Sequence, residues 1–92
     1  MRINFAHIRY PSTSGGYINF AVFDAKASSN TTSANQAVLN QLTFAARSAD
    51  HKIDQSAIAF TENGQLRFFG DKNLVDFLSK NGLPQWTHWI DT

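Results

Sequence analysis

Cysteine is absent from the 92 residues, so the chain has no disulfide framework and no thiolate ligand for zinc. Charged residues make up only 16% of the chain, below the usual quarter, and eight Lys plus Arg oppose seven Asp plus Glu. This balance argues against an acidic DNA mimic and against a strong binder of phosphate backbones. No apolar run is long enough for a signal peptide or a membrane span, which predicts a cytoplasmic protein without membrane association.

Hydrophobic residues are plentiful by comparison, at 42% of the chain, and aromatic residues reach 13%. A chain of this length can bury roughly 60–65% of the surface of its unfolded form, which is enough for one modest core. We therefore expect a single folded domain over residues 1–92.

Residues Ser33–Ala49 carry the clearest helical pattern. Their apolar residues recur at steps of three and four, which places them on one stripe of a helix. Ser33 and Gln36 have the spacing of a capping box at the helix start. The residues of the predicted stripe are Ala34, Val38, Leu42, Ala45 and Ala49.

Two strand candidates precede this helix and resemble each other. Ile3–Ala6 has the letters INFA, and Ile18–Ala21 repeats them. The alternation sends Ile and Phe to one face and Asn to the other, so the two segments are expected to pair side by side.

A β-hairpin is predicted after the helix. Asn63-Gly64 is a strong two-residue turn signal because both residues tolerate positive φ, and apolar segments flank it. A two-residue turn would place Thr61 opposite Leu66 and Ala59 opposite Phe68.

A second helix is predicted from the N-cap candidate Asp71 to the stop signal at Gly82, followed by a last short strand within Gln85–Thr92. The order is ββαββαβ. We expect an α+β domain with about five strands, mainly antiparallel, and two helices packed on one face of the sheet. Without its first strand this order resembles the ferredoxin-like plan, which hosts many unrelated functions.

Catalytic and metal motifs are missing. His7, His51 and His88 are expected on separate elements and show neither an i, i+4 pair nor an HExxH pattern. No serine lies in a GxSxG elbow, and the carboxylates are scattered. The sequence thus predicts a non-enzymatic protein with no catalytic residue, no metal and no cofactor, and a small enzyme of unrecognised type stays as an alternative.

The βαββαβ order is also that of the RNA-recognition motif, whose third strand carries aromatic residues that stack on bases. Gln65–Phe69 lacks the glycines of that motif, and Gly16–Phe23 departs from it at Ile18 and Asn19. Single-stranded RNA or DNA binding is kept as a second alternative, with direct nucleic-acid binding expected to be weak.

Recognition of another macromolecule is the main prediction. Trp86 and Trp89 would lie on opposite faces of a strand, so a small domain cannot easily bury both. Phe44 falls off the apolar stripe of the first helix, with Arg47 nearby, and aromatic residues and Arg are enriched at binding hot spots. The predicted partner-binding residues are Trp86, Trp89, His88, Phe44, Arg47, Tyr10, Tyr17 and Lys26.

In size, composition and architecture, the chain resembles the small inhibitors of phages and mobile elements, above all anti-CRISPR proteins. These inhibitors share no sequence motif, so the resemblance assigns no residue role. It implies steric inhibition of a host defence protein or ribonucleoprotein, such as a CRISPR effector complex, in the host cytoplasm.

Overall fold

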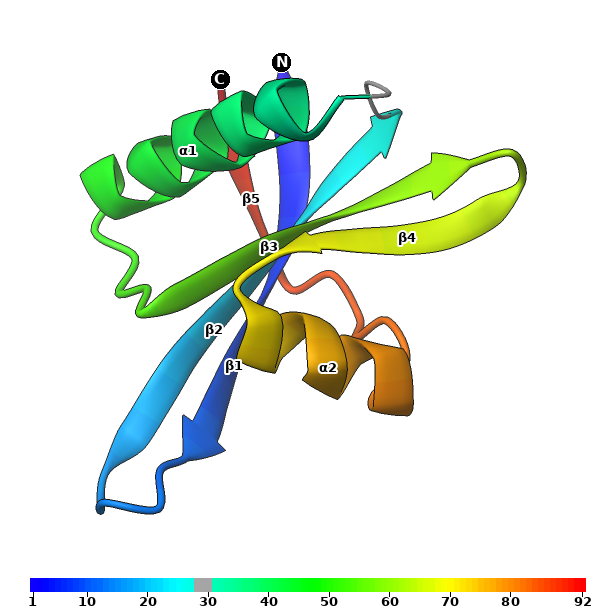
Figure 1. The fold of residues 1–92 in the computed structure, drawn as a ribbon. Coiled ribbons are helices and arrows are strands. Elements are labelled where there is room, and N and C mark those ends of the chain that lie inside the picture. The colour runs from blue at the N-terminus through cyan, green and yellow to red at the C-terminus, as the bar shows by residue number, and fades with distance from the viewer. Residues whose placement is uncertain (28–30) are drawn as a thin grey trace.

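The computed structural model describes residues 1–27 and 31–92, with no side-chain description for residues 26 and 27. Its elements follow the predicted order ββαββαβ and form one five-stranded sheet between two helices (Figure 1). They are β1 (Arg2–Pro11), β2 (Tyr17–Ala27), α1 (Thr32–Ser48), β3 (Gln55–Glu62), β4 (Gln65–Gly70), α2 (Lys72–Asn81) and β5 (His88–Asp91).

The sheet has the strand order β4-β3-β2-β1-β5. Three of its neighbouring pairs are antiparallel, and the pair β2–β3 is parallel, so the sheet is mixed. In the ferredoxin-like plan another strand separates the two parallel strands of a βαβ unit. Here β2 and β3 are direct neighbours, so the ferredoxin-like prediction is wrong.

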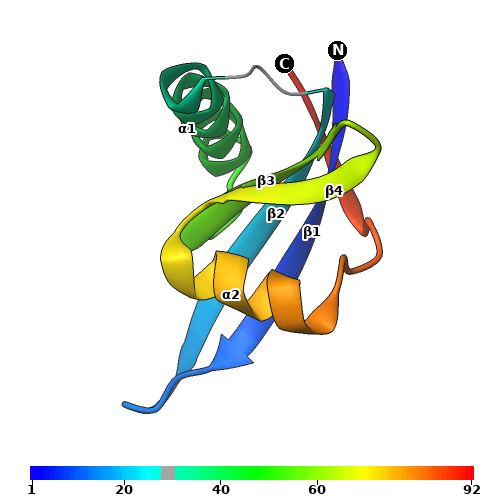
Figure 2. The ribbon, with the colours of Figure 1, turned by 45° about the vertical axis from the view of Figure 1, so that its right-hand side comes forward.

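The helices lie on opposite faces of the sheet, and the predicted packing on one face is also wrong (Figures 1 and 2). β2 alternates between two cores: Ala21 and Phe23 pack in the core under α1, whereas Phe20 and Val22 pack in the core under α2. β2 and β3 are inner strands, and each has an uninterrupted apolar segment, Phe20–Phe23 and Ala57–Phe60, which is typical of strands that are covered on both faces.

Local signals at the hairpin are confirmed. Asn63 and Gly64 both have positive φ, at 51° and 78°, and the pairs Thr61–Leu66 and Ala59–Phe68 are as expected. The predicted stop at Gly82 is also confirmed, because α2 ends at Asn81 and the Gly82 N–H donates to the carbonyl of Leu78.

α1 has nearly the predicted bounds, but its details differ. Thr31 is the N-cap, and its Oγ1 accepts a hydrogen bond from the Ala34 N–H, so Ser33 does not cap the helix. Of the predicted stripe only Leu42 is fully buried, because the helix is rotated toward its larger apolar side chain Leu39. The buried residues of α1 are Asn35, Leu39, Leu42, Thr43 and Ala46.

Candidate functional site

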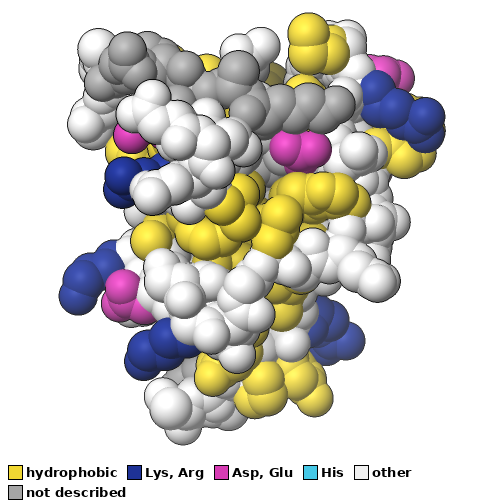
Figure 3. Space-filling view, turned by 90° about the vertical axis from the view of Figure 1, so that its right-hand side faces the viewer, with side chains coloured by type: hydrophobic (Ala, Val, Ile, Leu, Met, Phe, Trp, Pro, Cys, Tyr) yellow, Lys and Arg dark blue, Asp and Glu magenta, His cyan; other side chains and the backbone are white. Residues whose placement is uncertain are grey.

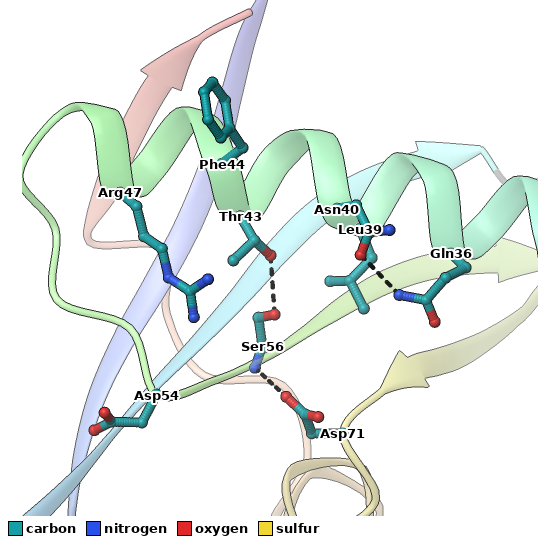
Figure 4. A pocket seen from close by; sticks show the side chains of 9 residues that line it. All are labelled: Gln36, Leu39, Asn40, Thr43, Phe44, Arg47, Asp54, Ser56 and Asp71. Atoms are coloured by element: carbon teal, nitrogen blue, oxygen red, sulfur yellow. Dashed lines mark hydrogen bonds between the residues drawn. The ribbon is translucent and has the colours of Figure 1, made fainter.

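A polar groove of about 480 Å³ lies between α1 and the start of β3, where β4 passes into α2 (Figure 4). We call it the helix groove. Most of its lining side chains are polar or charged. It is lined by Gln36, Leu39, Asn40, Thr43, Phe44, Arg47, Asp54, Ser56 and Asp71.

Hydrogen bonds around Ser56 form the floor of the helix groove. The Ser56 and Thr43 hydroxyls lie 2.9 Å apart and join β3 to α1. The Ser56 N–H donates to Oδ2 of Asp71 at 2.8 Å, and the Asp71 N–H donates to the carbonyl of Ser56 at 3.0 Å. Asp71 stands at the N-cap position of α2 as predicted, but its side chain braces β3 and makes no cap hydrogen bond.

Gly70 allows this close approach of β4 to β3. Its φ is +152°, and a Cβ at this position would come within 2.4 Å of the Ser56 carbonyl oxygen and 2.6 Å of the Ala57 Cα. Both neighbours are backbone atoms, so a side chain here would push the strands apart and move Asp71 away from Ser56.

Arg47 and Asp54 form one end of the groove. Arg47 Nη2 donates to the carbonyl of Ile53 at 2.9 Å. The Asp54 carboxylate accepts hydrogen bonds from the backbone N–H of Asn19 at 2.8 Å and from its side-chain amide at 3.2 Å. These bonds lower the pKa of Asp54, with further contributions from Lys52 and Arg47, so the carboxylate is held in its charged form.

Phe44 stands at the rim of the helix groove with 74% of its surface exposed. Its ring points away from the Thr43–Ser56 pair, on the outer side of α1, whereas Arg47 points into the groove (Figure 4). Phe44 and Arg47, which the sequence predicted together, are therefore one turn apart on α1, but Phe44 faces solvent and Arg47 faces the groove.

The outer surface of α1 is almost free of charge. Arg47 is the only charged residue among its 17 residues. Surface helices usually carry charged residues on the face turned to solvent, whereas the centres of protein interfaces are depleted of charge. Sequence reasoning missed this signal, although the helix sequence alone contains it.

The serine of the groove is not paired with a base in the described part of the structure. No histidine is among the lining residues, and the buried Ser56 hydroxyl has the Thr43 hydroxyl as its partner. The Asp71 carboxylate accepts from the Ser56 backbone N–H, whereas activation of a serine requires a base at its hydroxyl.

The two tryptophans lie apart from the helix groove. β5 begins only at His88, so Trp86 precedes the strand and does not share it with Trp89 as predicted. Trp86 is half-buried against the core under α2, whereas Trp89 is 51% exposed and the Arg2 guanidinium lies 4.0 Å above its ring.

Tyr10 and Tyr17 lie near the turn between β1 and β2. Tyr10 stacks on Phe20 with a centroid distance of 5.7 Å and meets the edge of Phe77 at 5.4 Å. Tyr17 is exposed, and the Arg9 guanidinium lies 4.3 Å above its ring. Lys26 belongs to β2, but its side chain lies outside the described part of the structure. The seven predicted residues whose side chains the structure describes therefore do not form one surface.

His88 belongs to a cluster that the sequence did not predict. Its ring centroid lies 5.4 Å from that of His51 and 6.0 Å from that of His7, so the fold brings the three imidazoles together. Within the described residues, no three His, Cys, Asp or Glu side chains are arranged so that they could hold a metal ion.

A more apolar hollow lies between β4 and α2, on the side opposite α1. Leu66, Phe68, Val75 and Leu78 contribute its apolar lining. The face on the right-hand side of Figure 1 carries hydrophobic side chains in a band across its middle, with charged side chains around it (Figure 3). β4 is the outermost strand on this side of the sheet.

No family model, no curated protein and no solved structure matches this chain. In the part of the chain that the structure describes, no helix has the length and apolar character needed to cross a membrane.

Proposed function

We propose that this chain is a non-enzymatic binding protein that recognises another protein, or the protein part of a ribonucleoprotein, through α1 and the helix groove. The observation that carries the proposal is Phe44, a large aromatic side chain that stands 74% exposed on a regular helix. An exposed aromatic residue beside a groove is the kind of side chain that anchors an interface.

Two further features support a protein partner. The uncharged outer surface of α1 can be buried against a partner without desolvating charges, which is a large part of the cost of polar interfaces. The groove beside it offers a carboxylate from Asp54 and the remaining amide atoms of Gln36 and Asn40, which are joined by a hydrogen bond from Gln36 Nε2 to Asn40 Oδ1.

The specific form that we propose is a steric inhibitor of the anti-CRISPR type, which occupies a functional surface of a host defence complex in the cytoplasm. The small size, the absence of catalytic motifs in the sequence and the compact α+β architecture support this form. Binding of single-stranded RNA through an open sheet has less support, because helices cover both faces of the sheet and Phe68 and Phe69 pack beneath them.

Capture from lysates of phage-susceptible bacteria tests the proposal. The wild-type chain, Phe44→Ser and Leu66→Ser are immobilised, and the lysate is treated with nuclease in one arm. Leu66 is the matched control because it is an exposed apolar residue of β4, outside both α1 and the groove. We expect a defined complex to bind to the wild type and to Leu66→Ser, and Phe44→Ser to weaken its binding by about 30-fold, or roughly 2 kcal/mol.

The captured complex is then tested for inhibition. Its binding or cleavage of nucleic acid should be fully inhibited when one chain has been added per site. Inhibition by Phe44→Ser should require a correspondingly higher concentration. Equal binding by Phe44→Ser and the wild type would contradict the proposed surface. Salt-dependent binding of short single-stranded oligonucleotides in place of a protein would favour the nucleic-acid alternative.

A further inference from the structure

Three histidines from distant parts of the sequence gather near Phe5 on the α1 face of the sheet, and two of them contact its ring. His51 meets the Phe5 ring edge-on at a centroid distance of 4.9 Å, and His88 stacks on it at 5.2 Å. His7 lies against His88, and its Nε2 is buried without a hydrogen-bond partner in the described structure. We call His7, His51 and His88 the histidine cluster.

The histidine cluster and the helix groove share one segment of chain, the corner formed by residues 49–54. The corner starts at the end of α1, where the His51 N–H donates to the Ala46 carbonyl at 3.1 Å. It ends at Asp54, which lines the groove and whose N–H donates to the Asn19 carbonyl at 2.8 Å. Between them Ile53 is buried, and its carbonyl accepts the hydrogen bond from Arg47.

Charge on the cluster opposes this packing. Burial lowers the pKa of His51, and the neighbouring His88 of β5 and His7 of β1 lower it further, whereas Asp50 of the same corner raises it. The net shift is downward, so the folded chain favours neutral His51 and the unfolded chain takes up a proton first as the pH falls. The contribution of His51 to stability is therefore complete above about pH 6.5, the ordinary pKa of histidine, and it decreases as the pH falls below that value.

We infer that the histidine cluster is a proton-sensitive contact that holds the corner 49–54 against the sheet at neutral pH and loosens it in mild acid. Because Arg47 and Asp54 depend on this corner, loosening alters one end of the helix groove. The consequence for partner binding rests on the proposed function. The response of the corner itself does not.

Two-dimensional NMR in the presence of EDTA tests the inference on the chain alone. The imidazole signals are titrated from pH 8 to pH 5, and the exchange of corner amides is measured at pH 7.5 and pH 5.5 and corrected for intrinsic rates. We expect the corner amides to lose protection at pH 5.5 while amides of β2 and β3 keep theirs. Unchanged protection in the corner would overturn the inference.

Variants separate a charge effect from a packing effect. His88→Gln should raise the pKa of His51, and His7→Gln should raise it by less, because His88 has the larger influence of the two. Asp50→Asn should lower it further, and Asn tolerates the left-handed conformation of this residue, whose φ is 66°. Identical titration of His51 in all of these chains would overturn the inference.

Partner capture at pH 7.5 and 5.5 separates this inference from the proposed function. Weaker capture at pH 5.5 by the wild type than by His88→Gln supports the inference. Absence of capture at every pH would count against the proposed function alone, because the corner response is measured without a partner.

Discussion

The two helices cover opposite faces of the same sheet, yet they differ in what they bury and in what they expose. The buried polar residues of the described chain, Asn19, Asn35, Thr43 and Ser56, belong to the α1 side or to α1 itself. The core under α2 consists of apolar residues. On the outside, α2 is the more charged of the two helices. It carries Lys72, Asp76 and Lys80 within ten residues, whereas α1 carries only Arg47 in 17.

This difference separates a structural face from the face that we propose binds a partner. A charged exterior over an apolar interior is the usual arrangement of a helix whose role is to cover a core. Buried polar groups stabilise little on balance, but they fix positions because each must keep its hydrogen-bond partner. The α1 side thus holds Phe44 and the groove in a defined geometry, whereas the α2 side buries a smaller core that is apolar throughout.

The largest expected effect is in the core under α2. Leu74 is fully buried, and Leu74→Ala should lower the free energy of unfolding by about 2–5 kcal/mol, because it removes apolar contacts and leaves a cavity. Leu66→Ala is the control, since Leu66 is half exposed and should change stability by no more than about 0.5 kcal/mol. Chemical denaturation measures both. A loss below about 1 kcal/mol for Leu74→Ala would contradict the structural role assigned to the α2 face.

A smaller effect is expected from the hydroxyl pair under α1. Thr43→Val keeps the shape of the side chain but leaves the buried Ser56 hydroxyl without its partner, which should destabilise the chain by about 1–3 kcal/mol. The double variant Thr43→Val with Ser56→Ala removes both polar groups.

A double-mutant cycle on unfolding free energies isolates this pair. We expect the double variant to lose less than the sum of the two single variants, with a coupling of about 0.5–3 kcal/mol. Additive losses would mean that the two hydroxyls do not interact, and the difference between the two faces would then rest on the exposed residues alone.

Local chemistry explains which parts of the fold could be predicted from the sequence. The Asn63-Gly64 turn and the stop at Gly82 depend on residues next to each other in the chain, and both were correct. The placement of the helices depends on whether β2 is an inner strand, which is decided by its pairing with β1 and β3. The prediction treated β2 as an alternating strand with one core face, although its uninterrupted apolar segment Phe20–Phe23 is typical of a strand covered on both faces, and the helices were wrongly expected on one face.

The same distinction between local and long-range contacts applies to the candidate site. Phe44 and Arg47 were predicted because their positions on one helix can be derived from helical periodicity. Asp54, Ser56 and Asp71 join them only through the closure of α1 over β3 and the passage of β4 into α2. The histidine cluster likewise forms by pairing of β1 with β5 and by the turn after α1, so its members appeared unrelated in the sequence.

The smallest expected effect concerns the acid response of the α1 side. The pKa of Asp54 is lowered, first by the Asn19 backbone N–H, so its charged form contributes stability above the ordinary value of about 4. That contribution is lost as the pH falls through the lower value of the folded state. Asp54→Asn, which cannot ionise, should therefore show a shallower decrease in unfolding midpoint from pH 6 to pH 2 than the wild type, as measured by denaturant titration at each pH. Asp76→Asn, on the outer surface of α2, controls for the change in net charge. If both variants flatten the decrease equally, net charge explains the acid response, and the Asp54–Asn19 contact does not distinguish the α1 face from the α2 face.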